Sequence, residues 1–189
     1  GISSFGAGGS NAHVIIEEYV APTAVSATGP QGPFALVLSA RQPERLQERA
    51  QQLLQAIEDG GWGDEALPAL AYTLQVGREA MEERLALVAE TMAQVREKLA
   101  AFVEGHSGID ELYRGQVKRN KETLAALAAD EDMAGAIDAW LAKGKLHKLA
   151  ELWVKGLAFD WERLYDGAPR PPRMSLPTYP FARERHWVP

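Results

Sequence analysis

The residues that could carry out covalent chemistry lie together at Gly105-His106-Ser107-Gly108, where a histidine precedes a serine between two glycines. A serine activated by a base can accept an acyl group, and such serines often occupy a Gly-x-Ser-x-Gly turn between a strand and a helix. The second glycine of that pattern is Ile109 here, and an amphipathic segment precedes the serine. We therefore interpret the segment as a loop that ends a helix at Gly105, with an acyl-transfer site at Ser107 as an alternative.

The other reactive residue types give weaker signals. The chain has no cysteine, which removes disulfides, thiolate ligands and thiol nucleophiles. Four scattered histidines have no second ligand at metal-binding spacing: His13, His106, His147 and His186. The acidic run Asp130-Glu131-Asp132 lies where a helix is expected to start, so it fits compensation of the helix dipole. No metal or cofactor site and no catalytic residue is predicted.

Composition limits the classes of partner. The 189 residues are 46% apolar and 24% charged, which is typical of one soluble globular domain with tails. The net charge is -6 and the basic residues are interleaved with acidic ones, so nucleic acid is not an expected partner. No apolar run is long enough to span a bilayer, which excludes a membrane and favours a cytoplasmic location.

The first two thirds of the chain alternate between short apolar runs and amphipathic segments. Strands are predicted at 34–38, 85–88 and, more weakly, 112–113. Helices are predicted from Pro43 to the Gly60-Gly61 pair, from a capping Asp64 to Gly77, and from Thr91 to Gly105. Strands that alternate with helices are commonly joined by right-handed crossovers, so we expect an α/β fold with a small, three-stranded, parallel sheet covered by helices.

After Val117 the pattern becomes helical, and it predicts a hairpin of two short helices. Its apolar positions offer more surface than a hairpin can bury on itself, which indicates contact with a partner; packing on the α/β layer of the same chain is the alternative. These positions are Leu124, Leu127, Met133, Ile137, Trp140 and Leu141. The proline-rich end predicts an extended strap, and its packing residues would be Trp153, Trp161, Leu176, Tyr179, Pro180, Phe181 and Trp187.

The first residues read Ser3-Ser-Phe-Gly-Ala-Gly-Gly-Ser-Asn-Ala-His-Val-Ile-Ile-Glu-Glu18 and resemble the closing segment of modular polyketide ketosynthases, which have a thiolase fold. The resemblance implies that the turn is a remnant of the ketosynthase active site, comprising Phe5, Gly6, Ala7, Gly8, Gly9 and Asn11. It also implies that the amide of Ala7 corresponds to a donor to the thioester oxyanion. The family's catalytic cysteine and histidines lie upstream of this segment, so the chain by itself is expected to have no activity.

The remaining length resembles the segments that flank an acyltransferase. Residues 37–41, 71–79 and 84–88 are similar to the linker between ketosynthase and acyltransferase, and 152–161 and 176–187 are similar to the strap that follows the acyltransferase. Only residues from about 115 to 145 stand between them, too few for an acyltransferase. This resembles synthases whose acyltransferase acts in trans, in which a short helical insert joins neighbouring ketosynthases side by side.

The resemblance implies four segments and a function for them. Residues 1–19 would be the last ketosynthase strands, 20–33 a linker, 34–168 a flanking subdomain with its helical insert at 117–143, and 169–189 the strap. The expected function is to brace the ketosynthase of the same polypeptide and to associate laterally with neighbouring synthase chains. A docking platform for a free-standing acyltransferase is the alternative, besides the site at Ser107.

Overall fold

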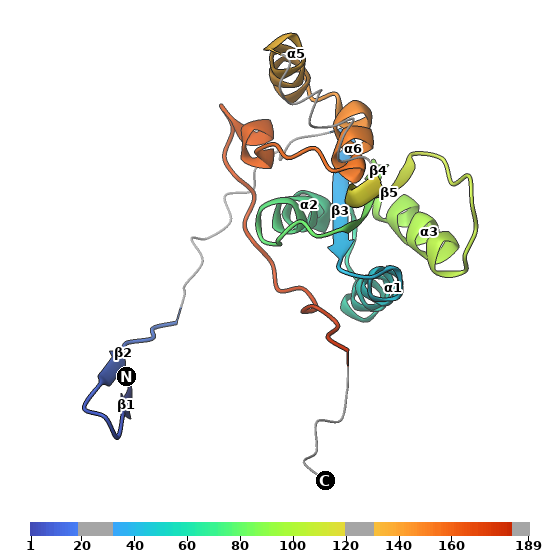
Figure 1. The fold of residues 1–189 in the computed structure, drawn as a ribbon. Coiled ribbons are helices and arrows are strands. Elements are labelled where there is room, and N and C mark those ends of the chain that lie inside the picture. The colour runs from blue at the N-terminus through green and yellow to red at the C-terminus, as the bar shows by residue number, and fades with distance from the viewer. Residues whose placement is uncertain (19–31, 120–130, 183–189) are drawn as a thin grey trace.

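The computed structural model describes residues 1–18, 32–119 and 131–182, which form two separate sheets and several helices (Figure 1). The strands are β1 Ile2–Phe5, β2 Asn11–Val14, β3 Phe34–Ala40, β4 Glu83–Ala89 and β5 Leu112–Gln116. The helices are α1 Pro43–Gly60, α2 Leu67–Val76, α3 Met92–Val103, α5 Glu131–Ala142 and α6 Leu146–Lys155. Two 3₁₀ helices, η1 Asp64–Ala66 and η2 Trp161–Tyr165, connect them.

The three predicted strands form one sheet in the order β3-β4-β5, but the prediction of a parallel sheet is wrong. Both pairs are antiparallel: Ala40 at the end of β3 lies opposite Glu83 at the start of β4, and Glu83 lies opposite Gln116 at the end of β5. The fold is therefore α/β with an antiparallel sheet.

The connections explain the strand directions. Between β3 and β4 the chain forms the two predicted helices, α1 and α2, and it returns to the end of β3 that it left. There the Met81 amide donates to the Ser39 hydroxyl at 3.0 Å. Between β4 and β5 only α3 is helical, and residues 104–111 then return the chain to the end of β4. The Val88 amide donates to the carbonyl oxygen of Glu111 at 3.0 Å, just before β5 begins. Each strand consequently starts beside the end of the one before it.

The core lies around the middle strand. All seven residues of β4 are buried, so both faces of this strand are covered. Helices α1 and α3 pack on each other, α2 lies along β3, and α6 contacts β4 and β5. The buried face of α1 follows the predicted helical spacing through Leu46, Ala50, Leu53 and Ile57.

Local signals fix most helix ends. Helix α1 starts with Pro43 and ends at Gly60, and it is capped by Gly61, which has a positive φ of 57°. The predicted cap of α3 is confirmed, because the Thr91 hydroxyl accepts the amide of Gln94 at 3.2 Å. The predicted capping of the second helix by Asp64 is wrong: the Asp64 carboxylate instead accepts the amide of Met92, the first residue of α3, at 2.6 Å.

Strands β1 and β2 form a hairpin with the register Ile2↔Val14. Every residue from 1 to 18 is exposed, so within the described ranges this hairpin has no core of its own. No described helix combines the length and the apolar character needed to cross a bilayer.

Candidate functional site

The Gly-His-Ser segment is an exposed loop after α3. The amide of Gly105 donates to the Phe102 carbonyl and the amide of His106 to the Ala101 carbonyl, which is the hydrogen-bond pattern of a helix ended by glycine. Gly105 has a φ of 83°. The predicted loop is confirmed, and Ser107 is not on a strand-to-helix elbow.

The glycine-rich turn predicted as a ketosynthase remnant closes the β1–β2 hairpin. The amide of Gly6 donates to the Ser10 carbonyl at 2.8 Å, and the amide of Gly9 donates to the Gly6 carbonyl at 3.0 Å. A Cβ at Gly6 would lie 2.6 Å from the Ser10 oxygen, so this position requires glycine. The turn holds the Ala7 amide at its exposed tip, with Gly8 next to it.

Large apolar side chains of this hairpin and the residues after it face solvent. They are Ile2, Phe5, Val14, Ile15 and Ile16, and the side chain of Phe5 is 79% exposed. Contiguous exposed apolar surface of this kind marks a binding surface. The turn and strands therefore have the composition of a segment that is covered in a larger assembly.

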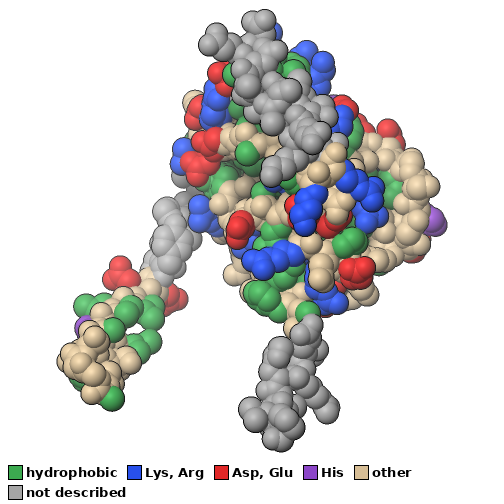
Figure 2. Space-filling view, viewed as in Figure 1, with side chains coloured by type: hydrophobic (Ala, Val, Ile, Leu, Met, Phe, Trp, Pro, Cys, Tyr) green, Lys and Arg blue, Asp and Glu red, His purple; other side chains and the backbone are tan. Residues whose placement is uncertain are grey.

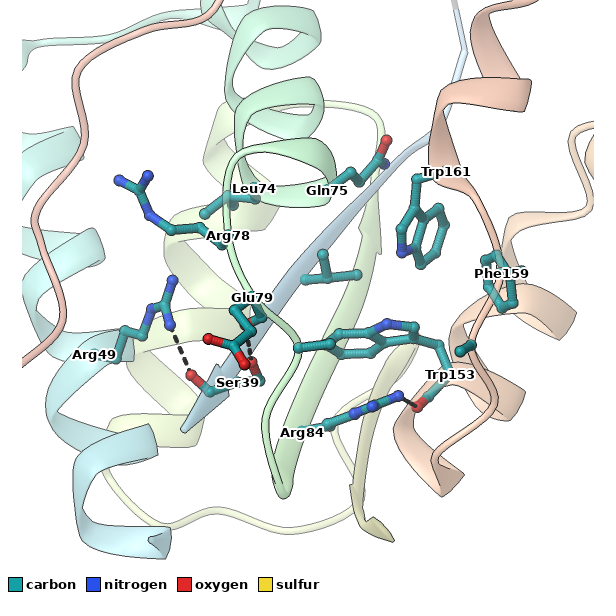
Figure 3. Close-up of a pocket in the computed structure, with 13 residues that line it drawn as sticks. Ser39, Arg49, Leu74, Gln75, Arg78, Glu79, Arg84, Trp153, Phe159 and Trp161 are labelled. Carbon is teal, nitrogen blue, oxygen red and sulfur yellow. Dashed lines mark hydrogen bonds between the residues drawn. The ribbon is translucent and has the colours of Figure 1, made fainter. Parts of the chain in front are cut away.

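A cavity of about 160 Å³ lies where the sheet, α2 and the segment from α6 to η2 meet (Figure 3). Its lining combines arginines with aromatic rings: Val37, Ser39, Arg49, Leu74, Gln75, Arg78, Glu79, Ala80, Arg84, Trp153, Ala158, Phe159 and Trp161. The predicted strap residues Trp153 and Trp161 come together here, with ring centroids 6.4 Å apart. The cavity itself was not predicted from the sequence.

Two arginines of the cavity are buried, each with 6% exposure. Arg49 donates through Nη1 to the Ser39 carbonyl at 2.7 Å. Arg84 donates through Nη1 to the carbonyls of Trp153 at 2.7 Å and Leu157 at 3.2 Å, and its guanidinium stacks on the Trp153 ring at 4.8 Å. Burial lowers the pKa of both guanidinium groups from their ordinary value. These cations are held by backbone carbonyls and an aromatic ring.

A hydrogen-bonded chain of neutral groups lies behind the cavity. The Tyr165 hydroxyl donates to Gln75 Oε1 at 2.8 Å, and Gln75 Nε2 donates to the Ala35 carbonyl at 2.7 Å. Burial raises the pKa of the Tyr165 hydroxyl well above its ordinary value, so this hydroxyl is a donor at neutral pH. The chain ties η2 to α2 and β3.

Comparison with known proteins identifies the part of the chain that contains most of β3, all of β4 and the helices α1, α2 and α3. Residues 37–106 match the family described as RhiE-like, KS-MAT linker domain. This part of the chain is a RhiE-like linker domain. The predicted resemblance to the segment between a ketosynthase and an acyltransferase is thereby confirmed.

Similar proteins extend the match to the whole chain. The polyketide synthase PksL of Bacillus subtilis (strain 168) is 55% identical over 190 residues, which is 100% of this chain and 4% of PksL. The ketosynthase from module 6 of the bacillaene synthase from Bacillus subtilis 168 matches with a TM-score of 0.78 and 37% identity, over 99% of this chain and 31% of that one.

A third relative gives the same result. The ketosynthase from module 1 of the bacillaene synthase from Bacillus amyloliquefaciens FZB42 matches with a TM-score of 0.73 and 44% identity. That match covers 98% of this chain and 30% of the ketosynthase chain. The chain thus spans less than a third of these structures and a small fraction of the curated synthases.

The segment that follows the RhiE-like linker domain leaves and re-enters the fold at neighbouring points. The Tyr113 hydroxyl of β5 lies 3.4 Å from His147 Nδ1, near the start of α6. A Cβ at Gly115 would lie 2.2 Å from the carbonyl oxygen of Val154, so the α6 backbone packs directly on β5. Residues 117–145 therefore span two points that lie side by side.

The predicted lateral surface falls on α5 and on residues outside the described ranges. Leu124 and Leu127 lie outside them. Leu141 is buried in the core of its own chain, and Ile137 and Trp140 pack against that core while remaining half-buried. Met133 is also half-buried. Leu141 is therefore occupied within its own chain, while Met133, Ile137 and Trp140 keep part of their surface exposed.

The strap crosses the RhiE-like linker domain along α2. The Met174 amide donates to the Thr73 hydroxyl at 3.0 Å, and Arg78 Nη2 donates to the Leu176 carbonyl at 3.4 Å. The Tyr179 hydroxyl accepts the amide of Arg41 at 3.2 Å. Pro180 is buried and Phe181 is exposed, while Trp187 lies outside the described residues.

The buried arginines had a signal in the sequence. Arg49 lies on the apolar face of α1, three residues after Leu46 and four before Leu53. Arg84 comes directly before the apolar run of β4 and is buried like the rest of that strand. A cation inside an apolar pattern predicts a buried polar contact, but the partners come from β3 and α6 and could not be read from local spacing.

Proposed function

We propose that the chain is a non-catalytic flanking subdomain that braces the ketosynthase of a modular polyketide synthase. The observation that carries this proposal is the overlay of almost the whole chain on less than a third of solved ketosynthase chains. The missing two thirds would supply the body that covers Phe5 and the other exposed apolar residues of the β1–β2 hairpin. In that assembly the Ala7 amide would serve the oxyanion site of a reaction whose nucleophile lies elsewhere in the protein.

The strap gives the brace its mechanical basis. It contacts the linker domain at three points along the chain: Thr73, Arg78 and Arg41. Its partners lie 98 to 138 residues away in the sequence, so each contact closes a long loop. In the proposed arrangement residues 1–19 complete the ketosynthase, 34–168 form the flanking subdomain and 169–189 fasten the two.

A strap variant in the longer synthase polypeptide, with its ketosynthase, tests the brace. Arg78→Met removes the strap anchor, and Arg173→Met changes an exposed arginine of the strap as a matched control. We expect Arg78→Met to lower the melting temperature of the ketosynthase and the rate of condensation, with Arg173→Met close to the parent. Equal melting temperatures and rates for both variants would rule the brace out. The purified 189-residue chain should show no turnover of acyl thioesters.

The same proposal extends to the type of synthase. Between Gln116 and Leu146 there is room for about thirty residues, which is far below the size of an acyltransferase domain. We infer that the acyltransferase acts in trans. Calorimetric titration of a free-standing acyltransferase into this chain tests whether that enzyme docks here. Saturable heat supports a docking platform, and no heat at high concentration rules out docking.

Lateral association through residues 117–143 is supported by the position of α5. Among the described elements this helix packs mainly on α6 and η2 (Figure 1). The Arg163–Asp138 ion pair joins it to η2. Ala134 and Gly135 are exposed on it. An acidic residue at Ala134 would repel a second copy without disturbing the packing within the chain.

The matched test uses two substitutions that each change the net charge by one. Ala134→Glu lies on the proposed surface, and Gln51→Glu lies on the exposed face of α1. We expect light scattering to show weaker self-association for Ala134→Glu alone. Equal self-association of the parent and both variants would contradict the lateral role.

A further inference from the structure

The cavity has a cationic end and an aromatic end. Arg49 and Arg78 lie at one end, and Trp153, Phe159 and Trp161 lie at the other (Figure 3). Among its lining residues three arginines stand against one carboxylate, that of Glu79, which is exposed. The electrostatic character of the lining therefore favours an anion.

The aromatic end contains a buried donor without an acceptor. Trp161 is 5% exposed, and within the described residues its Nε1 has no hydrogen-bond partner. Figure 3 shows the indole nitrogen turned toward the cavity, on the side of Trp153. Buried indole N–H groups normally find an acceptor, so an acceptor is expected inside the cavity.

The cationic end contains a buried charge without a counterion. Arg49 is nearly as buried as Trp161, and in the described part of the chain no carboxylate lies within ion-pair distance of its guanidinium. One of its N–H groups is bound by the Ser39 carbonyl. Desolvation, followed by the nearby charge of Arg78, lowers the pKa of Arg49. The Coulombic attraction of an anion in the cavity would offset both effects.

We propose that this cavity binds a small organic anion, a short carboxylate that carries a second acceptor such as a ketone oxygen. The carboxylate would lie at the Arg49 end, the carbon chain beside Trp153 and Phe159, and the second acceptor at Trp161 Nε1. A cavity of about 150 Å³ is large enough for a ligand the size of benzene, which matches an oxo acid of five carbons. The proposal goes beyond bracing, because a brace needs no ligand.

The probe for the test is 4-oxopentanoate, titrated into the ¹⁵N-labelled 189-residue chain. We expect the indole N–H resonance of Trp161 to shift in a saturable way, whereas that of Trp62, which does not line the cavity, should stay in place. Pentan-2-one, which has the ketone without the charge, should bind at least tenfold more weakly. Absence of a saturable shift, or equal binding of the neutral ketone, would overturn the proposal and leave a cavity that holds only water.

Two variants assign the contacts, with the indole resonance of Trp153 as the reporter. Trp161→Phe keeps an aromatic ring but removes the N–H, and should weaken binding about three- to tenfold. Arg49→Gln should weaken it tenfold or more. Arg173→Gln, an exposed change of equal charge, should leave binding unaltered. Retained affinity in both cavity variants, in samples whose other indole resonances match the parent, would also overturn the proposal.

Discussion

Replacing Arg84 by methionine should weaken the packing of α6 on the sheet, because it removes hydrogen bonds but keeps most of the side-chain volume. Arg84 comes from the middle strand, and its guanidinium binds backbone carbonyls of Met81, Trp153 and Leu157. Two of these carbonyls belong to the end of α6 or to the residues just after it. Methionine fills much of the same space but cannot donate.

The expected loss follows from the contacts. A hydrogen bond from a charged donor contributes about 1.5–3 kcal/mol, and two such bonds join Arg84 to the α6 end. Stacking on Trp153 at 4.8 Å adds about 0.5–2 kcal/mol. Relief of the buried charge offsets part of this sum, because desolvation lowers the pKa of Arg84. We expect the free energy of unfolding to fall by about 3–4 kcal/mol.

Urea unfolding followed by tryptophan fluorescence measures this loss. Arg114→Met is the matched control, since Arg114 is exposed on the neighbouring strand and lies 5.8 Å from the Phe102 ring. An exposed cation–π contact contributes about 0.5–1 kcal/mol, so the control should lose less than a third as much. A loss for Arg84→Met no larger than that for Arg114→Met would refute the assignment of Arg84 as the tie between β4 and α6.

Three further changes probe other contacts. Gly115→Ala should cost about 3 kcal/mol, because the added Cβ would lie 2.2 Å from the Val154 carbonyl oxygen. Thr91→Ala removes the cap of α3 and should lower the free energy of unfolding by about 1 kcal/mol. The hydrogen bond from Lys98 lowers the pKa of Glu111 in the folded chain. The stabilisation that this bond gives is therefore complete above the pKa of the unfolded chain, near 4.5, and is lost as the pH falls through the lower pKa of the folded chain. Urea titrations between about pH 6 and about pH 3 should show this loss in the parent and less of it in Lys98→Met.

Two of these changes have a matched variant. Gly135→Ala adds a Cβ that meets no atom, so it should stabilise α5 slightly and show that the cost at position 115 is steric. Thr91→Ser retains a capping hydroxyl and should stay close to the parent. Similar losses of stability for Gly115→Ala and Gly135→Ala would contradict the steric contact at position 115. A loss for Thr91→Ser as large as that for Thr91→Ala would contradict the cap.

Strand and helix positions could be predicted because they depend on neighbours in the sequence. The α1 face from Leu46 to Ile57 and the Thr91 cap are local patterns, and the structure retains them. Strand direction depends on how far each connection carries the chain. The segment 104–111 has no periodicity that would show that it brings the chain back to the end of β4, so an antiparallel order could not be predicted from it.

The candidate sites divide in the same way. The glycine-rich turn at Gly6 was identified by motif, since its backbone geometry needs a particular residue type at a fixed place. The cavity joins Arg49, Arg84 and Trp161, which are up to 112 residues apart in the printed numbering. Their meeting depends on the packing of α6 and η2 against the sheet, which no single window of sequence encodes.

Because Tyr113 and His147 lie side by side, the segment that joins β5 to α6 can be replaced by segments of other lengths. An inserted segment would begin and end beside the same strand, so it would not have to distort the surrounding fold. Doubling the length of a flexible loop adds only about 0.6 kcal/mol of closure entropy. A short insert and a long one therefore place similar demands on the chain at this point, and replacing one by the other need not change the packing of β5 on α6.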